Sequence, residues 1–304
     1  MARATALRGR QADSLVHARE KSFIRVSSSY KAQLSVESSE LSERAERVDI
    51  VGLSFWIPRM SDDASRMEKA KSQGFPFRTI LQTRELASGA VMLDIGANLG
   101  RTSIPRAVLG DFQFIYAAEP DLANYECLVR NVSDNHLRGR IFPDHAAIGS
   151  RDGDTKLMRS PYSGGHRLLS EGAEPGSREV VTVPGYTLDS WVKRLSIDLN
   201  EIAFVKIDTQ GWEAHILSGA TSLLRQAHIA WQLEIDPAHL ESSGQPLSDL
   251  FEIVERYMTH FIDLNSSAEG DRVREIGELM SALEYVGKTN GPKTDILVYR
   301  STGD

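Results

Sequence analysis

Residues 91–100 read VMLDIGANLG, and this stretch decides the fold of the chain. A short apolar run reaches Asp94 and passes through Gly96, Asn98 and Gly100 into a helical pattern, which predicts a buried strand, a tight turn and a helix. Glycine accepts positive φ and lets a ligand approach a backbone that carries no Cβ. The free amides at the start of a helix face such a ligand. The turn is therefore predicted to bind a nucleotide-like molecule.

The spacing of the glycines separates two classes of nucleotide site. Dinucleotide-binding turns have the spacing G-x-G-x-x-G, which brings a helix against a pyrophosphate. Here the spacing is G-x-x-x-G, and the strand closes on an acid. The Asp94 carboxylate would repel a pyrophosphate, but it suits the ammonium and sulfonium cations of S-adenosylmethionine, directly or through water. We therefore expect S-adenosylmethionine as the cofactor, with contacts from Asp94, Gly96, Asn98 and Gly100.

Two further acids follow the next two strands. Glu119 ends the run FIYAAE about twenty residues beyond the turn, where a carboxylate accepts hydrogen bonds from both ribose hydroxyls. Asp144 follows the third strand and is predicted to contact the adenine amino group, with a turn-capping role as the alternative. Pro105 lies inside the helix expected after the turn and lacks an amide donor, so we expect a kink or an early break there.

From Val91 onward, short apolar runs alternate with helical patterns, which is typical of βαβ units. The predicted fold is α/β and Rossmann-like: an open, mostly parallel seven-stranded sheet with an antiparallel edge strand and helices on both faces. The strands are expected in VMLDI, FIYAAE, IFPDHAA, FVKID, IAWQLEI, FIDLN and TDILVYR.

Three regions are expected along the chain. Residues 90–304 form the S-adenosylmethionine-binding domain. Residues 51–89 form an N-terminal lid or subdomain, with a helix that Ser61 caps and Gly74 ends. Residues 1–50 form a polar, basic N-terminal extension, disordered or partly helical. For this extension we favour a solvated segment over an anionic-partner site or a targeting segment.

Composition excludes several classes of protein. The 304 residues contain no apolar run long enough to span a membrane and no secretory signal, so a cytoplasmic protein is expected. Cys127 is the only cysteine, which excludes an internal disulfide and a multi-thiolate zinc site. The net charge is −7, and the body beyond the basic extension is more acidic still, which argues against a nucleic-acid-binding face.

The motifs together resemble the FkbM-type methyltransferases, within the class I methyltransferase fold. The similarity extends from about Phe75 to Arg300 and rests on DIGANLG, AAEP, HAAIG, VTVPGYTLDSWV and, above all, FVKIDTQGWEAHILSGA. The resemblance implies S-adenosylmethionine-dependent methylation, usually of a hydroxyl oxygen on a sugar, polyketide or other secondary metabolite. Gln210 departs from the family pattern, which often has an acid at this position.

The fourth strand carries the candidate catalytic groups. Methyl transfer is an in-line displacement, so a protein must mainly align the nucleophile and remove its proton. Lys206 and Asp208 point to the same side at the carboxyl end of the strand, and Glu213 follows in the first turn of the next helix. We predict that Asp208 orients the acceptor hydroxyl or acts as its base, with Lys206 and Glu213 setting its charge and position. The alternative is a Lys206–Glu213 ion pair that joins strand and helix.

Other candidates lie outside this strand. His166, in YSGGHRLL, is a candidate base, with a surface polar role as the alternative. Glu234 and His239 are expected either to line the acceptor pocket or to belong to a solvated loop. Asp208, Glu234 and Asp236 offer oxygen ligands for a hard cation, but such carboxylates arise readily at strand ends, so no metal is predicted.

The expected reaction is O-methylation of a small-molecule or glycan hydroxyl. Residues 155–178 and those before Val91 are expected to shape the acceptor site. The alternatives are a nitrogen or RNA acceptor, an NAD-dependent dehydrogenase, and a noncatalytic module that binds S-adenosylmethionine. A nucleic-acid partner and a membrane span are not expected, and a homo-oligomer is compatible with the sequence.

Overall fold

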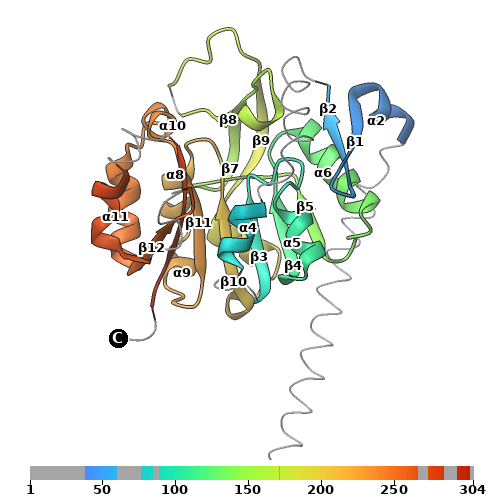
Figure 1. Ribbon diagram of the computed structural model, residues 1–304. Coiled ribbons are helices and arrows are strands. Elements are labelled where there is room, and N and C mark those ends of the chain that lie inside the picture. The colour runs from blue at the N-terminus through green and yellow to red at the C-terminus, as the bar shows by residue number, and fades with distance from the viewer. Residues whose placement is uncertain are drawn as a thin grey trace, which may run out of the picture.

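A computed structural model describes residues 38–59, 77–84, 89–170, 172–265, 273–283 and 293–301. Figure 1 shows an α/β body in which a central sheet lies among helices and a smaller sheet stands at one end. The helix predicted between Ser61 and Gly74, and residues 1–37 of the predicted extension, lie outside the described residues.

The central sheet has the strand order β13-β12-β14-β11-β10-β3-β4-β5. Its strands are β3 (Gly89–Ile95), β4 (Phe112–Ala118), β5 (Ile141–Asp144), β10 (Ile202–Ile207), β11 (Ala230–Ile235), β12 (His260–Asp263), β13 (Arg274–Glu275) and β14 (Thr294–Tyr299). The run from β5 to β11 is parallel, and β14 is antiparallel to both of its neighbours, β11 and β12. All seven predicted runs contribute a strand, which confirms the predicted α/β fold.

The sheet ends in an antiparallel edge strand, as predicted, because the two-residue β13 at the edge pairs antiparallel with β12. A second antiparallel strand, β14, lies inside the sheet. The reason is in the sequence of β14, because Ile296, Leu297 and Val298 are consecutive buried residues. A strand that buries successive side chains needs cover on both faces, which an interior position provides.

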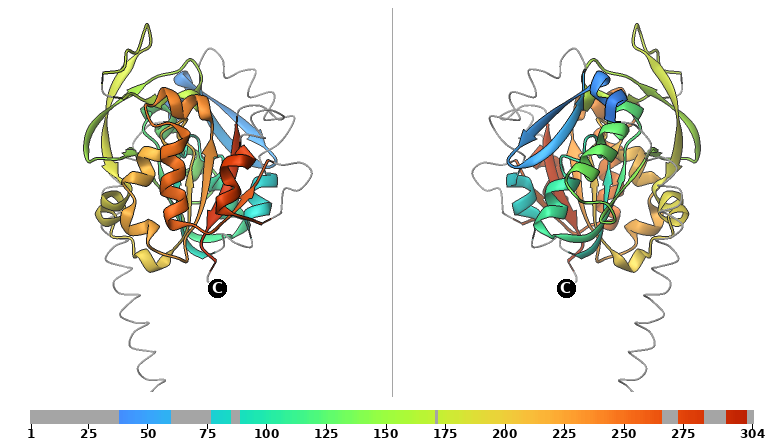
Figure 2. Two further views of the ribbon diagram at one scale, coloured as in Figure 1. Left: turned by 90° about the vertical axis from the view of Figure 1, so that its left-hand side faces the viewer. Right: turned by 90° about the vertical axis from the view of Figure 1, so that its right-hand side faces the viewer.

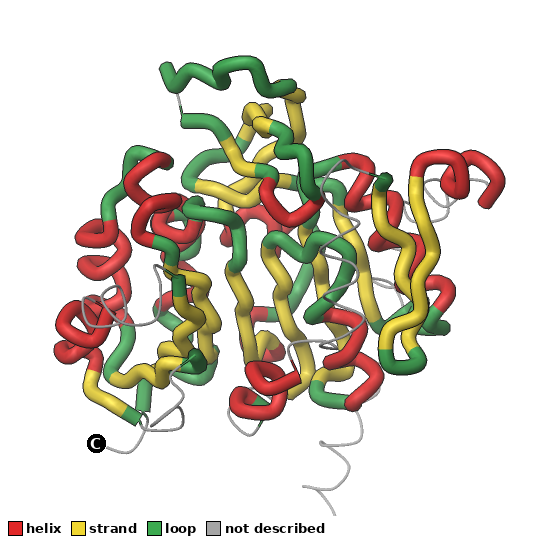
Figure 3. Tube along the Cα trace, turned by 45° about the horizontal axis from the view of Figure 1, so that its top comes forward, coloured by secondary structure: helices red, strands yellow, loops and turns green. Residues whose placement is uncertain are grey.

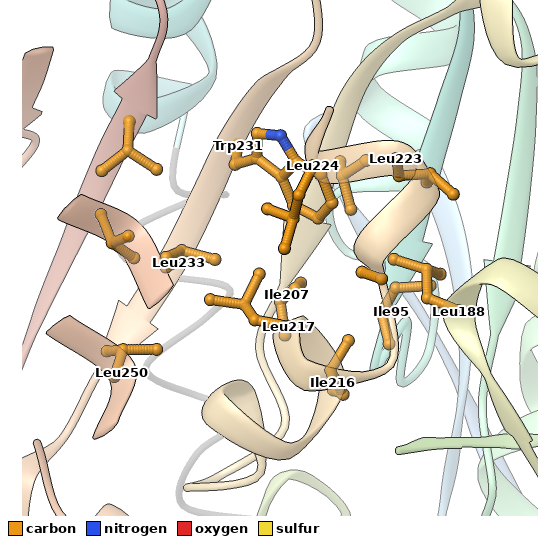
Figure 4. Close-up of a cluster of buried hydrophobic side chains, with 14 of the residues drawn as sticks. Ile95, Leu188, Ile207, Ile216, Leu217, Leu223, Leu224, Trp231, Leu233 and Leu250 are labelled. Carbon is orange, nitrogen blue, oxygen red and sulfur yellow. The ribbon is translucent and has the colours of Figure 1, made fainter. Parts of the chain in front are cut away.

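Helices cover both faces of this sheet. In β3, Val91 and Leu93 belong to one core cluster and Met92 to the other, as the two-residue period of a strand requires. The first face is covered by α7 (Leu188–Arg194), α8 (Glu213–Ser218), α9 (Thr221–Leu224) and α11 (Leu247–Tyr257). Figure 4 shows leucine and isoleucine side chains of these helices against Ile207, Trp231 and Leu233 of the sheet. The opposite face is covered by α5 (Ser103–Leu109) and α6 (Leu122–Asp134).

The N-terminal hairpin belongs to the same body. Strands β1 (Ala45–Ile50) and β2 (Leu53–Pro58) follow α2 (Ser38–Arg44), and β2 lies along α6 (Figure 2). The Asn131 side chain on α6 accepts from the Trp56 amide at 2.5 Å and donates to the Trp56 carbonyl at 3.1 Å. The predicted boundary between residues 50 and 51 therefore falls in the turn of one hairpin, and this hairpin packs on α6.

A second sheet stands at the carboxyl ends of the central strands (Figures 1 and 3). Its order is β6-β9-β7-β8, with β6 (Ala147–Gly149), β7 (Gly153–Met158), β8 (Arg167–Leu168) and β9 (Val180–Thr187). The predicted run IFPDHAA is thus divided between β5 of the central sheet and β6 of the second sheet. The shorter elements are α4 (Phe77–Thr83), η1 (Ser163–Gly165), η2 (Leu199–Glu201), α10 (Pro237–Ser242) and η3 (Ile276–Glu278).

The helix after the nucleotide turn tolerates its proline. Helix α5 begins at Ser103, so Pro105 lies in the first turn, where an amide has no partner within the helix. The predicted kink or early break was therefore wrong, because the helix starts later than the sequence pattern indicated.

Candidate functional site

A pocket of about 310 Å³ lies at the carboxyl ends of β3, β4, β10 and β11, beneath β7 and β8. The strand order changes direction here, since β3 is flanked by β4 on one side and β10 on the other, and ligands of open α/β sheets bind at such a point. Of the predicted site residues, the pocket is lined by Gly96, Asn98, Glu119, His166, Lys206 and Asp208. Asp94, Gly100, Asp144 and Glu213 lie outside its lining.

The turn after β3 has the left-handed backbone that its glycines predicted. The φ angles of Gly96, Asn98 and Gly100 are 78°, 51° and 83°. A Cβ on Gly96 would lie 2.0 Å from the carbonyl oxygen of Asp208, so only glycine lets this turn pass the end of β10. A Cβ on Gly100 would instead meet the side chains of Leu128 and Ile104, so Gly100 serves helix packing.

Glu119 connects the turn to the next strand. Its Oε2 accepts from the Asn98 amide at 2.8 Å, and its Oε1 accepts from the Asp121 amide at 2.9 Å. Burial raises the pKa of this carboxyl group to about 8, although the hydrogen bonds from Asp121 and Asn98 act in the opposite direction. A carboxylate has about four acceptor positions, so Glu119 keeps capacity for hydroxyl donors in the pocket.

Asp94 lies beneath the pocket. Its side chain is fully buried, Oδ2 accepts from the Ser103 hydroxyl, and Oδ1 lies 3.9 Å from Lys206 Nζ. Asp94 and Lys206 face each other because they are register partners on β3 and β10. Asp94 lies outside the pocket lining, whereas Lys206 lines the pocket, so the charge of Asp94 acts on the pocket through Lys206.

Asp144 was predicted to contact adenine, but it is engaged elsewhere. Its Oδ2 accepts from Trp191 Nε1 at 2.7 Å and forms an ion pair with Arg194. Both partners belong to α7, so the carboxylate joins the end of β5 to that helix.

Lys206 and Asp208 form an ion pair at the mouth of β10, with 3.0 Å between Nζ and Oδ2. Burial alone would lower the pKa of Lys206, but the charges of Asp208 and Asp94 raise it above its ordinary value. Burial alone would raise the pKa of Asp208, but Lys206 and Lys293 hold it well below its ordinary value. At neutral pH, Lys206 is therefore a permanent cation and Asp208 a permanent anion.

Glu213 holds the turn that follows Asp208. Its Oε1 accepts from the Thr209 amide at 3.0 Å, the Thr209 hydroxyl at 3.1 Å and the Gly211 amide at 3.3 Å. Burial raises its pKa to about 7 against these hydrogen bonds. The alternative Lys206–Glu213 ion pair is not formed, because Lys206 pairs with the two aspartates and Glu213 with the turn.

His166 lies in the roof of the pocket. Its Nδ1 accepts from the Ser160 amide at 2.9 Å, and its Nε2 lies 3.7 Å from an oxygen of Asp121. The nitrogen lone pair of a neutral imidazole is thus occupied by a backbone donor, and this arrangement does not favour a role as base. Beside it, the side-chain amides of Asn98 and Asn124 donate to the Ser163 carbonyl at 2.8 and 2.9 Å. These contacts fix the segment Ser160–His166 over the cofactor turn.

Sequence reasoning missed two members of the site, Gln210 and Lys293. Gln210 has a φ of 59°, and its Nε2 donates to Glu234 Oε2 at 2.7 Å and to Asp208 Oδ1 at 3.3 Å. Lys293 Nζ contacts Oε1 of Glu234, whose side chain is 5% exposed. Glu234 lines the pocket, which was one of the two positions expected for it, the other being a solvated loop. His239 lies outside the lining, and its Nδ1 is 3.3 Å from Oδ2 of Asp236.

Two absences concern only the described part of the chain. Within these residues, no group of three or more histidine, cysteine or acidic side chains is arranged to hold a metal ion. No described helix has the length and apolar character needed to cross a membrane.

A family model and a curated relative both match this sequence. The sequence model of the methyltransferase FkbM domain matches residues 94–273, more than half of the chain. The hexuronic acid methyltransferase AglP of Haloferax volcanii is 25% identical over 150 residues, which are 49% of this chain and 57% of that protein. The matched region thus spans little more than half of this curated relative.

Solved structures with related arrangements include the methyltransferase FkbM of Methylobacillus flagellatus. Its TM-score is 0.38 at 15% identity, over 70% of this chain and 44% of that chain. Another is TYW2 of M. jannaschii in complex with AdoMet, with a TM-score of 0.42 at 12% identity, over 85% of this chain and 87% of that chain.

Proposed function

Because this chain belongs to the FkbM methyltransferase family, we propose that it uses S-adenosylmethionine to methylate a hydroxyl oxygen on a sugar, glycan or related small molecule. One observation carries the proposal. A single pocket joins the Glu119 carboxyl group, beside the glycine turn, to the carboxyl groups of Asp208 and Glu234. The hexuronic acid named for the similar Haloferax volcanii protein supports an acceptor of the sugar class.

The chemistry of the pocket fits S-adenosylmethionine. Glu119 offers acceptor positions for ribose hydroxyls beside the turn of Gly96 and Asn98. The wall near Glu119 is apolar, as an adenine ring requires, and is formed by Ala118, Ala146, Ile148, Leu157 and Leu168. At the other end, the ionised carboxyl group of Asp208 provides negative charge for a cationic ligand.

When bound, S-adenosylmethionine supplies a methyl group activated by its sulfonium. The residues of this chain have two tasks, to orient the acceptor hydroxyl and to take up its proton. We assign to Asp208 the orientation of the hydroxyl and assistance in removing its proton. Its side chain is one-third exposed, lines the pocket and is held by Lys206, which supports this assignment. Glu213 acts at a distance from the reacting atoms, since it fixes the Thr209–Gly211 turn that follows Asp208.

The test is transfer of a labelled methyl group. The full chain is incubated with methyl-labelled S-adenosylmethionine and, in parallel, with neutral oligosaccharides, uronate-containing oligosaccharides and RNA. Label in a sugar that survives mild alkali supports ether formation on a hydroxyl. Alkali-labile label would indicate an ester, and label in RNA alone would overturn the proposal.

Asp208→Asn tests the residue assignment. We expect a loss of at least about 100-fold in kcat with little change in cofactor affinity, because the negative charge that orients the acceptor hydroxyl and assists removal of its proton is lost while Glu119 remains. Asp154→Asn, an exposed substitution on β7, is the matched control. Near-normal kcat of Asp208→Asn at saturating cofactor would remove this residue from the mechanism.

A further inference from the structure

Glu234 forms a close pair with Asp208 inside the pocket. Gln210 Nε2 donates to both carboxyl groups, to Glu234 Oε2 at 2.7 Å and to Asp208 Oδ1 at 3.3 Å, so that one amide group bridges the two acids. They come from neighbouring strands, because Asp208 follows β10 and Glu234 lies in β11. Two carboxyl groups that share one site repel each other when both are ionised, which favours a pair that keeps one proton.

The surroundings determine which member holds this proton. Burial and the charge of Asp208 raise the pKa of Glu234 to about 9, against the effect of Lys293. Asp208 is held ionised by Lys206 and Lys293. At neutral pH the pair therefore carries one proton, which resides on Glu234.

The other charged groups nearby leave this distribution in place. Asp295, the register partner of Glu234 on β14, is itself buried, and its pKa is raised by burial and by Asp208. On the following helix, α10, Asp236 and His239 contact each other at 3.3 Å. Lys293 is thus the cation in direct contact with Glu234, and Lys206 the one in direct contact with Asp208.

We propose that Glu234 is a further catalytic residue, which shares one proton with Asp208 in the ligand-free pocket. Binding of a sulfonium cation displaces this proton to solvent. The emptied Asp208–Glu234 pair can then take up the proton of the acceptor hydroxyl. Proton release on ligand binding depends on the pocket alone. Proton uptake from the acceptor rests on the proposed function, methyl transfer to a hydroxyl.

The proton count of the reaction is balanced. The acceptor oxygen forms its bond to the methyl carbon, the carbon–sulfur bond breaks with its electron pair left on sulfur, and the O–H bond breaks with its pair left on oxygen. The released proton joins the Asp208–Glu234 pair, which returns to its singly protonated state. Loss of the sulfonium charge and recovery of the proton therefore occur together, and each favours the other electrostatically.

The experiment compares S-adenosylmethionine, which carries a positively charged sulfonium, with S-adenosylhomocysteine, in which the sulfur is an uncharged thioether. S-adenosylmethionine and S-adenosylhomocysteine are titrated into the full chain at pH 8 by calorimetry, in phosphate and in Tris, whose ionisation enthalpies differ. We expect S-adenosylmethionine to release roughly 0.5–0.9 proton per site more than S-adenosylhomocysteine, because a nearby cation lowers the pKa of Glu234 from about 9 to below the working pH. Equal proton release by the two ligands would overturn the proposal.

Glu234→Gln assigns the proton to its residue. This variant keeps the side-chain volume but cannot ionise, so the difference between the ligands should fall to less than about 0.2 proton. Glu241→Gln, an exposed substitution on α10, should retain the full difference. A persisting difference in Glu234→Gln would place the proton elsewhere and contradict the inference.

A second measurement is independent of the variant's folding. In the unsubstituted protein, the infrared band of a protonated carboxyl group should disappear on addition of S-adenosylmethionine and persist on addition of S-adenosylhomocysteine. A band that behaves alike with both ligands would contradict the proposal. No acceptor is present in either experiment, so their outcome is separate from success or failure of the sugar-labelling assay.

Discussion

Replacement of Glu213 by glutamine should change how the stability of this protein depends on pH. Glu213 is 1% exposed, and its Oε1 accepts hydrogen bonds from Thr209 and Gly211. Its Oε2 has no hydrogen-bond partner among the described residues. Burial raises the pKa of the carboxyl group from 4.5 to about 7.

The sign and size of the effect follow from this shift. A carboxyl group with a raised pKa in the folded state contributes stability that is fully present below pH 4.5 and lost as the pH rises through about 7. The shift corresponds to a change of about 3 kcal/mol in the free energy of unfolding. Glutamine stays neutral throughout and still accepts from the turn, but it places an NH2 group where Oε2 has no partner, which costs about 1–3 kcal/mol. Glu213→Gln should thus be less stable than the parent at pH 5 and as stable or more stable at pH 8.

The assay is urea unfolding of the ligand-free protein, followed by tryptophan fluorescence at pH 5 and pH 8. The quantity compared is the difference in unfolding free energy between variant and parent, and it should move by about 2.5 kcal/mol in favour of the variant from pH 5 to pH 8. Glu255→Gln, an exposed substitution on α11, should show no such movement. If the difference for Glu213→Gln were the same at both pH values, the ionisation of a buried Glu213 would be refuted.

Three other substitutions test the site by calorimetry and urea unfolding. Glu119→Ala should weaken S-adenosylhomocysteine binding about tenfold or more at pH 8, because the ribose hydroxyls lose their acceptor; unchanged affinity would contradict the assignment. Gly96→Ala should lower the unfolding free energy by more than about 3 kcal/mol, because the new Cβ would clash with the Asp208 carbonyl oxygen. Gly110→Ala is the control, because Gly110 has a similar φ but no atom near the position of its Cβ, and it should cost only about 1 kcal/mol. Equal losses in the two variants would refute the predicted clash at Gly96. Asp144→Asn should leave ligand affinity within about twofold but lower the unfolding free energy by about 1–2 kcal/mol, because the Asp144 carboxylate joins β5 to α7. A large loss of ligand affinity would instead support the predicted contact between Asp144 and adenine.

The sequence predicted those parts of the site that depend on local geometry. The turn at Gly96 could be predicted because its glycines serve a backbone shape that residues 94–100 define by themselves. The same-side placement of Lys206 and Asp208 follows from the two-residue period of a strand, and the structure brings them to 3.0 Å. The strand-end position of Glu119 likewise placed it in the pocket.

The sequence could not predict which acids the fold would use internally. Asp94 and Asp144 both end strands of the parallel sheet, where ligands bind. The register of β3 on β10 turns Asp94 toward Lys206, and the packing of α7 brings Arg194 to Asp144. Both neighbours lie far away in the sequence, so no local pattern reports them. A strand-end acid alone therefore does not separate a ligand contact from a tertiary one.

Lys293 shows why the interior position of β14 matters for the site. The amino end of an antiparallel strand lies at the same edge as the carboxyl ends of its parallel neighbours, so the residue before Thr294 enters the pocket. Without β14 beside β11, Asp208 and Glu234 would have only Lys206 as a nearby cation among the described residues. Two neighbouring buried carboxyl groups with one counter-ion would ionise together only at high pH. Lys293 and the bridging Gln210 stabilise the Asp208–Glu234 pair with its one exchangeable proton. The antiparallel direction of β14 is what brings Lys293, the second cation, to this pair.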